Sequence, residues 1–262
     1  MPNDRREFMK LAAAGATAVG AAVVSTPAAA QPTEQFKNIK ALTFDFYGTC
    51  LDVFAATTAP CEQLFPGKGA QLAQIWRAKQ LLYLQMRTVM GRYRPFWDVA
   101  GDALVFAANS LQLELTDQKK KRLVEAFFFE QPAFPDVKPG LEAMKKKGVK
   151  LAVVANGDQK RMEARAKEVE ILDLFDEFIS VDEVKVYKMH PRAYNLGSEH
   201  LQIPNCDIGF VAAHSWDIMG AASAGLTTFW IKRSPIEVPE ELGFRATAVV
   251  HAMTDIAPQL PG

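Results

Sequence analysis

Apolar positions fall into short runs separated by helix-like stretches, with one long helical region between the first run and the rest. The first run lies in residues 41–52 and ends abruptly on Asp45, shortly before Gly48. A short apolar run bounded by a turn signal is typical of a buried strand in a parallel sheet. After residue 132 the alternation resumes, with strands predicted over residues 150–155, 178–181, 208–212, 227–231 and 247–250 and helices over residues 140–147 and 159–169. This order predicts a doubly wound parallel sheet, an α/β fold.

Residues 53–132 carry a different pattern, in which apolar side chains recur every three or four positions. Amphipathic helices are predicted over residues 71–90, 96–111 and 117–129, the last with Thr116 as its N-cap. The region begins just after the first strand and ends at a proline-rich stretch. We therefore expect a helical cap domain, residues 53–132, inserted into a core domain made of residues 38–52 and 133–258.

Composition narrows the classes of partner. The 262 residues suffice for one α/β domain with an insert, and 30 basic residues balance 30 acidic ones. A nucleic-acid partner is therefore not expected. Basic clusters at residues 119–122 and 145–147 lie in helix-like stretches, where they are typical of solvated faces.

The N-terminus has the features of a targeting segment. Arg5 and Arg6 precede an uncharged stretch, residues 11–24, and small residues follow at 28–30. This pattern predicts a twin-arginine signal peptide over residues 1–30, a mature chain from near Gln31, passage through the twin-arginine export machinery and a periplasmic location. A transmembrane anchor is the alternative, but the stretch is short and rich in alanine and glycine.

Cysteine content does not predict a disulfide framework. The chain has three cysteines, Cys50, Cys61 and Cys206. A bridge from Cys50 to Cys61 is possible, although Cys50 beside the first strand is more typical of a small buried apolar residue. Histidine and cysteine do not cluster with metal-ligand spacing, so no metal site is predicted.

Several predicted strands are followed by polar residues. Besides Asp45, these are residues 156–158, Lys188, and residues 214–217. The carboxyl ends of parallel strands meet at one edge, where open α/β sheets bind ligands. We therefore expect these groups to lie together, with the Thr49 hydroxyl holding the Asp45 carboxylate. The alternative is that Asp45 only caps a turn.

These residues carry a family resemblance. The chain resembles the haloacid dehalogenase superfamily, and specifically its type II L-2-haloacid dehalogenases, from about residue 38 to 255. The most specific motifs are residues 44–49, 76–81, 187–188 with Tyr194, and 215–217. The resemblance implies a Rossmann-like haloacid dehalogenase core with an inserted helical cap, and a possible homodimer.

The resemblance also implies a reaction that needs no cofactor, in which short (S)-2-haloacids and water give (R)-2-hydroxyacids through an aspartyl ester. Asp45 would attack the carbon that bears the halogen, as a carboxylate nucleophile. The implied roles of the other residues are these: Thr49 holds the nucleophile, Lys188 and Asp217 orient or activate water, Arg77, Asn156 and Trp216 cradle the halide, and Tyr194 steadies the network.

Tyr47 separates the chain from phosphatases of the superfamily, which carry a second aspartate at that position. A halide leaves without a proton, so its departure does not require a general acid. Tyr47 therefore favours dehalogenation over phosphoryl transfer, and a magnesium-dependent phosphatase is the first alternative. The second is an exported 2-haloacid-binding protein with little turnover, because Ala155 and Ala212 replace family serines. His214 replaces a family asparagine and can serve as a donor in its place.

Each candidate also has a purely structural interpretation. Arg77 can be an exposed helix residue, Trp216 a core indole, and Lys188 a surface lysine, while Asp217 can be the N-cap of the following helix.

Overall fold

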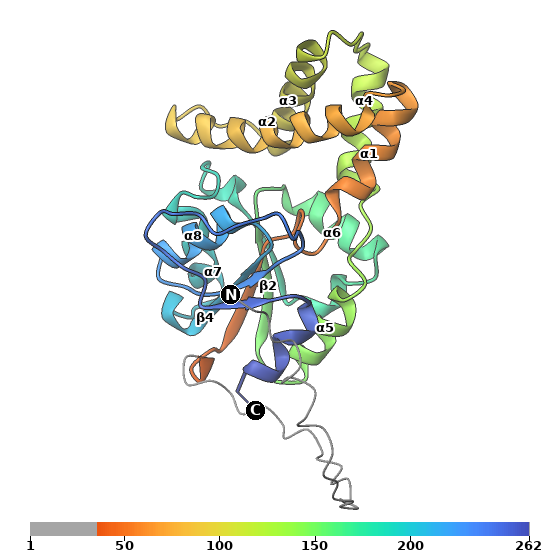
Figure 1. The fold of residues 1–262 in the computed structure, drawn as a ribbon. Helices are drawn as coiled ribbons and strands as arrows, with labels where there is room; N and C mark the ends of the chain where they lie inside the picture. The colour runs from red at the N-terminus through yellow and green to blue at the C-terminus, as the bar shows by residue number, and fades with distance from the viewer. Residues whose placement is uncertain (1–35, 262) are drawn as a thin grey trace, which may run out of the picture. The chain divides into compact units, whose positions relative to one another are not determined.

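The core is a parallel sheet. The computed structural model describes residues 36–261, and within them the strand order is β3-β2-β1-β4-β5-β6, with every neighbouring pair parallel. The predicted doubly wound α/β fold is thus confirmed (Figure 1). The strands are β1 (Ala41–Phe44), β2 (Lys150–Ala155), β3 (Glu177–Ser180), β4 (Ile208–Ala212), β5 (Thr227–Ile231) and β6 (Ala248–Val250).

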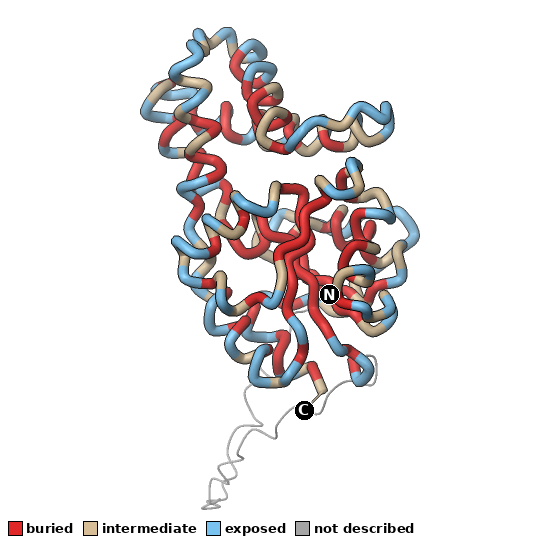
Figure 2. Tube along the Cα trace, turned by 180° about the vertical axis from the view of Figure 1, so that it is seen from behind, coloured by how far each residue is buried: buried red, intermediate tan, exposed pale blue. Residues whose placement is uncertain are grey.

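The central strand β1 lies between β2 and β4, where Phe44 is in register with Val153 and Val211. Every residue of β1 and β4 is buried, as expected for strands covered on both faces (Figure 2). Side chains from α5 (Val137–Lys145) and α6 (Gln159–Glu168) join one buried cluster, and those from α7 (Pro191–Leu201) and α8 (Ser215–Ser223) join a second. Short 3₁₀ helices lie at Leu172–Leu174, Val181–Glu183, Asn205–Asp207, Met253–Asp255 and Ala257–Gln259.

The region between β1 and α5 is helical. It contains α1 (Val53–Leu64), α2 (Gly69–Val89), α3 (Phe96–Ser110) and α4 (Asp117–Phe129), drawn from orange to yellow-green in Figure 1. Thr116 caps α4, since its side chain accepts a hydrogen bond from the Lys119 N–H. The indole N–H of Trp76 in α2 donates to the Ala100 carbonyl in α3 over 2.8 Å, so the two longest cap helices are tied together.

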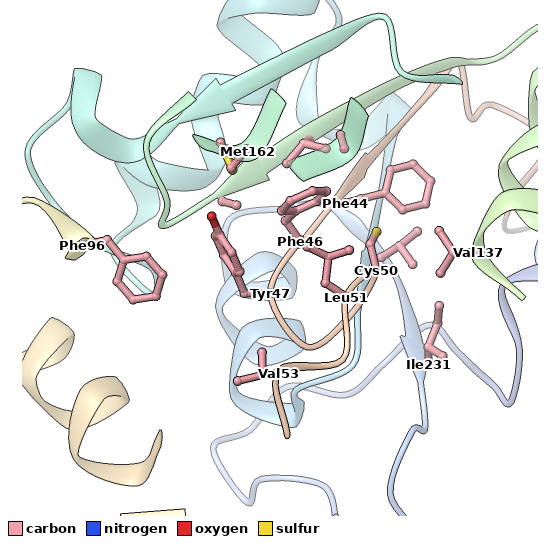
Figure 3. Close-up of a cluster of buried hydrophobic side chains, with 14 of the residues drawn as sticks. Phe44, Phe46, Tyr47, Cys50, Leu51, Val53, Phe96, Val137, Met162 and Ile231 are labelled. Carbon is pink, nitrogen blue, oxygen red and sulfur yellow. The ribbon is translucent and has the colours of Figure 1, made fainter. Parts of the chain in front are cut away.

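Tyr47 anchors the cap to the first loop of the core. Its ring lies 5.5 Å from the Phe96 ring and 5.9 Å from both the Phe127 and Phe128 rings, measured between centroids. Figure 3 shows the Tyr47 side chain extending away from Leu51, with Phe96 on its other side. Aromatic pairs at such distances contribute about 0.5 to 1.5 kcal/mol each beyond area burial. The loop that carries Asp45 is therefore packed directly against the cap.

The predicted export signal and its anchor alternative lie outside the described residues. Within residues 36–261, no helix is both long and apolar enough to cross a membrane. Cys50 and Cys61 are buried and unbridged, and Cys206 is exposed and also free, so the possible bridge from Cys50 to Cys61 is not formed.

Candidate active site

The loop after β1 places Asp45 at the carboxyl edge of the sheet. The chain turns at Gly48, which has a φ of 99° and whose N–H donates to the Leu51 carbonyl. Few residues other than glycine adopt this conformation readily. A side chain at position 48 would also collide with His214, because a Cβ there would lie 2.5 Å from Cε1 of the ring. Gly48 thus permits both the turn and the close approach of His214.

Both carboxylate oxygens of Asp45 are held. The Thr49 hydroxyl donates to Oδ2 over 2.8 Å, and the Lys188 ammonium donates to Oδ1 over 3.1 Å. Thr49 is itself fixed, since its Oγ1 accepts from the Ala213 N–H at 2.9 Å. Burial alone would raise the pKa of Asp45, but the Lys188 charge and the Thr49 hydrogen bond hold that pKa below its ordinary value. Asp45 is therefore an ionised, oriented carboxylate.

Lys188 bridges Asp45 to a second carboxylate. Its Nζ lies 2.9 Å from Oδ2 of Asp217, and both side chains are fully buried. The Tyr194 hydroxyl donates to Oδ1 of Asp217 over 2.7 Å. Burial raises the pKa of Asp217 to about 6, although the Lys188 charge opposes the shift. A carboxylate with this pKa can accept a proton near neutral pH.

Two of the structural interpretations are therefore wrong. Lys188 is no surface lysine, because none of its side chain is exposed. Asp217 is not an N-cap either, because α8 begins at Ser215 and has His214 as its N-cap residue.

Arg77 reaches the site from the cap. Its guanidinium donates to the Gln80 side chain over 2.7 Å and to the Tyr47 carbonyl over 3.2 Å. One of its nitrogens also lies 3.4 Å from Nε2 of His214. Burial, with Arg77 as the next cause, lowers the pKa of His214 to about 4, so this imidazole is neutral at neutral pH. Arg77 is therefore a cation with neutral hydrogen-bond partners, available to an anionic ligand.

Asp45, Arg77 and His214 line a small cavity, which we call the catalytic chamber, whereas Thr49, Lys188, Tyr194 and Asp217 lie behind Asp45 and do not line it. Its volume is about 10 Å³, and it is lined by Asp45, Tyr47, Arg77, Leu81, Leu84, Phe96, Asn156, His214 and Trp216. Tyr47 Oη, Trp216 Nε1 and His214 Nδ1 are buried without a hydrogen-bond partner among the described residues. Buried polar atoms normally have partners. Buried polar atoms without a partner around a chamber are therefore expected where a bound ligand supplies the missing hydrogen bond.

The structure does not place every expected polar group here. Asn156 lines the chamber, and its Oδ1 accepts from the Lys188 N–H at 3.1 Å. Asp158, however, points elsewhere: it caps α6 by accepting from the Arg161 N–H and pairs with the Arg161 side chain. Ala155 and Ala212 are fully buried strand ends that do not line the chamber.

Arg233 is a residue that sequence reasoning missed. Its Nη2 donates to the Thr49 carbonyl over 3.0 Å, and its Nη1 lies 2.7 Å from Oδ1 of Asp136. It follows β5, so a polar residue after a strand was the available signal. Because Thr49 holds Asp45, Arg233 helps to position the loop that carries Asp45.

We expect Arg233→Met to lower kcat about tenfold to a hundredfold with a smaller change in KM, because a shift of about 1 Å at a reacting group has an effect of this size. Arg233→Lys, which can keep the Asp136 ion pair, should recover part of the loss. Steady-state kinetics measure both variants, and Arg245→Met at an exposed site is the control. An unchanged kcat in Arg233→Met would contradict this role.

Comparison with known proteins agrees with this geometry. The family model for haloacid dehalogenase-like hydrolases matches residues 39–225. The (S)-2-haloacid dehalogenase of Pseudomonas sp. (strain YL) is 37% identical over 205 residues, covering 78% of this chain and 87% of that protein. Haloacetate dehalogenase H-2 of Moraxella sp. (strain B) is 36% identical over 197 residues, covering 75% and 87%.

A solved structure extends the likeness to three dimensions. The L-2-haloacid dehalogenase from Xanthobacter autotrophicus with chloropropionic acid covalently bound superposes with a TM-score of 0.79 at 29% identity, covering 84% of this chain and 97% of that one. Sequence and fold therefore agree over most of the described residues, and the chain belongs to the L-2-haloacid dehalogenase family of the haloacid dehalogenase-like hydrolases.

Proposed function

We propose that this hydrolase converts short (S)-2-haloacids to (R)-2-hydroxyacids through an ester on Asp45, without a metal. The observation that carries the proposal is the Asp45 carboxylate, held at both oxygens by Thr49 and Lys188 and facing a chamber lined by the Arg77 cation. An oriented carboxylate beside an anion-binding group has the arrangement required for displacement of a halide.

In the first step an Asp45 oxygen attacks the carbon that bears the halogen from the side opposite the halogen. The new carbon–oxygen bond forms as the carbon–halogen bond breaks, and the halide leaves with the electron pair. Arg77 and the unpartnered indole N–H of Trp216 are suited to receive that negative charge. The carbon is inverted, which converts the S substrate to an R ester.

In the second step water attacks the carboxyl carbon of the Asp45 ester. Asp217, whose pKa is raised to about 6, accepts a proton from this water. The ester bond between the carboxyl carbon and the original Asp45 oxygen then breaks, and that oxygen leaves as the product hydroxyl by taking up the proton that Asp217 accepted from water. Lys188, hydrogen-bonded to both carboxylates, offsets the negative charge that develops.

The phosphatase alternative is less well supported. Tyr47 occupies the position of the second aspartate in the superfamily's phosphatases, and its ring packs among cap phenylalanines. Burial raises the pKa of the Tyr47 hydroxyl above its ordinary value, which disfavours ionisation. Asp45 and Asp217 are bridged by the Lys188 ammonium.

Periplasmic export by the twin-arginine route and a homodimer stay predictions.

A halide-release assay tests the proposal. We expect the purified protein to release halide from chloroacetate or (S)-2-chloropropionate, to spare (R)-2-chloropropionate, and to keep its activity in excess chelator. Hydrolysis of a chromogenic phosphate ester that needs magnesium would support the phosphatase instead. Calorimetric binding of (S)-2-chloropropionate without halide release would support the binding protein.

A further inference from the structure

A second, larger cavity adjoins the catalytic chamber. Its volume is about 380 Å³, against about 10 Å³ for the chamber. Val53 and Phe54 of α1, Phe134 after the cap, and Ser234 after β5 contribute to its lining, and the charged side chains of Asp52, Arg233 and Glu237 lie at it as well. We call this cavity the outer chamber. The carbon-rich side chains among these residues make it suitable for an aliphatic group.

Arg77 and His214 line both chambers and so form the wall between them. The His214 ring is held in that wall. Its Nε2 lies 3.4 Å from the Arg77 guanidinium, its centroid lies 5.5 Å from that of Trp216, and its Cε1 occupies the space that a Cβ at residue 48 would need. The imidazole is thus packed from three directions.

The other walls of the catalytic chamber are filled. Leu81, Leu84 and Phe96 close it from the cap, and Leu84 and Phe96 are almost completely buried. A volume of about 10 Å³ is roughly the room that one water molecule needs. The outer chamber beyond the His214 ring is the adjoining cavity into which groups attached to a reacting carbon beside Asp45 can extend.

We propose that His214 is a specificity-determining partition, which restricts the enzyme to the shortest 2-haloacids by closing the catalytic chamber off from the outer chamber. This inference rests on the proposed function. The outer chamber is then an alkyl-chain subsite that the imidazole blocks. Because the pKa of His214 lies near 4, its replacement by a neutral side chain changes the shape of the wall and not its charge at neutral pH.

Opening the wall should widen chain-length specificity. Each additional methylene buried in the outer chamber is worth about fourfold in transition-state binding. We expect the wild type to prefer chloroacetate to 2-chlorohexanoate, and His214→Ala to raise the ratio of kcat/KM for 2-chlorohexanoate to that for chloroacetate at least tenfold. His214→Asn should raise it less, since more of the wall remains. The use of a ratio removes any loss common to both substrates.

Filling the outer chamber provides the matched control. Ser234→Phe in the His214→Ala background should lower the ratio of kcat/KM for 2-chlorohexanoate to that for chloroacetate back toward the wild-type value. Ile236→Phe, on the same loop at a position that is 87% exposed, should leave the ratio of His214→Ala unchanged. The inference is overturned if the wild type already hydrolyses 2-chlorohexanoate as well as chloroacetate, or if His214→Ala and His214→Asn, with melting temperatures that show them folded, keep the wild-type ratio.

Binding of unreactive acids separates this inference from the proposed function. Calorimetry with acetate and hexanoate should show the same relative gain for hexanoate in His214→Ala. If the wild type released no halide from any haloacid, the proposed function would fail, while the partition would still stand or fall on the calorimetric ratio. An equal hexanoate-to-acetate ratio in both proteins would refute the partition.

Discussion

Asp45→Asn is expected to lower halide release by about ten thousandfold or more, in the range found when a catalytic nucleophile is removed from an enzyme. The amide has nearly the shape of the carboxylate, and the Thr49 hydroxyl, now 2.8 Å from Oδ2, can still donate to its oxygen. The variant should therefore fold and bind a haloacid while losing the nucleophile. Steady-state halide release and a thermal melt measure the two properties.

Asp158→Asn is the matched control. Asp158 also follows a strand, β2, but it caps α6 and does not line the catalytic chamber. Its substitution should cost about 1 kcal/mol of stability or less and should leave kcat within a fewfold. Equal losses of activity in the two variants would indicate a general effect of removing charge at this edge of the sheet.

Isotope labelling identifies what Asp45 does. In a single turnover in heavy-oxygen water, the ester scheme places the label in the Asp45 carboxylate and an unlabelled oxygen in the product. Mass spectrometry of the peptide that contains Asp45 and of the hydroxyacid measures both. Label in the product and none in the protein would mean that water attacks the substrate directly, with Asp45 as a general base.

The core was predictable because hydrophobic periodicity is a local property of the chain. The run before Asp45 marked β1, and the sequence pattern gave α4 its bounds and its Thr116 cap. Helix α5 begins at Val137, three residues before the predicted start, since Pro139 in its first turn obscures the boundary. Helix α1, which contains Pro60, was not predicted as a separate element.

The site was predictable only as a set of residue types at strand ends. Family motifs pointed to Asp45, Lys188 and Asp217, but not to the arrangement in which one ammonium bridges both carboxylates. Asp158 shows the weakness of the strand-end rule, because a cap and a site residue have the same sequence signal. Arg233 follows β5 and so had the same strand-end signal, but its contact with a backbone carbonyl could not be predicted, since any residue can supply a carbonyl.

Lys188→Met should lower kcat/KM by about a thousandfold or more near neutral pH, which is the upper range for loss of one group that stabilises developing charge. The Lys188 ammonium is the cation hydrogen-bonded to both Asp45 and Asp217, at 3.1 and 2.9 Å. Without it, two buried carboxylates face each other, and their repulsion raises the pKa of at least one. A protonated Asp45 cannot attack carbon, and a protonated Asp217 cannot accept a proton.

The pH dependence of kcat/KM distinguishes loss of the Lys188 charge from loss of its packing, because lost packing alone would not shift the profile. In the wild type, activity should fall as the pH drops below about 6, where Asp217 becomes protonated. In Lys188→Met the acidic limb of the kcat/KM profile should move to higher pH by about one unit or more. The control is Lys185→Met, three residues away and exposed, whose profile should match that of the wild type.

The stability of Lys188→Met should depend on pH in the direction opposite to its activity: low pH lowers the activity but should reduce the loss of stability. Removing one partner of a buried ion pair costs roughly 3 to 5 kcal/mol when the remaining charges stay ionised. In Lys188→Met the folded-state pKa of a buried carboxylate lies above its unfolded value, so protonation favours the folded state. The melting temperature of the variant should therefore approach that of the wild type as pH falls from about 8 to about 5. A deficit that stays constant over this range, with an unshifted acidic limb, would show that Lys188 acts through packing and not through its charge.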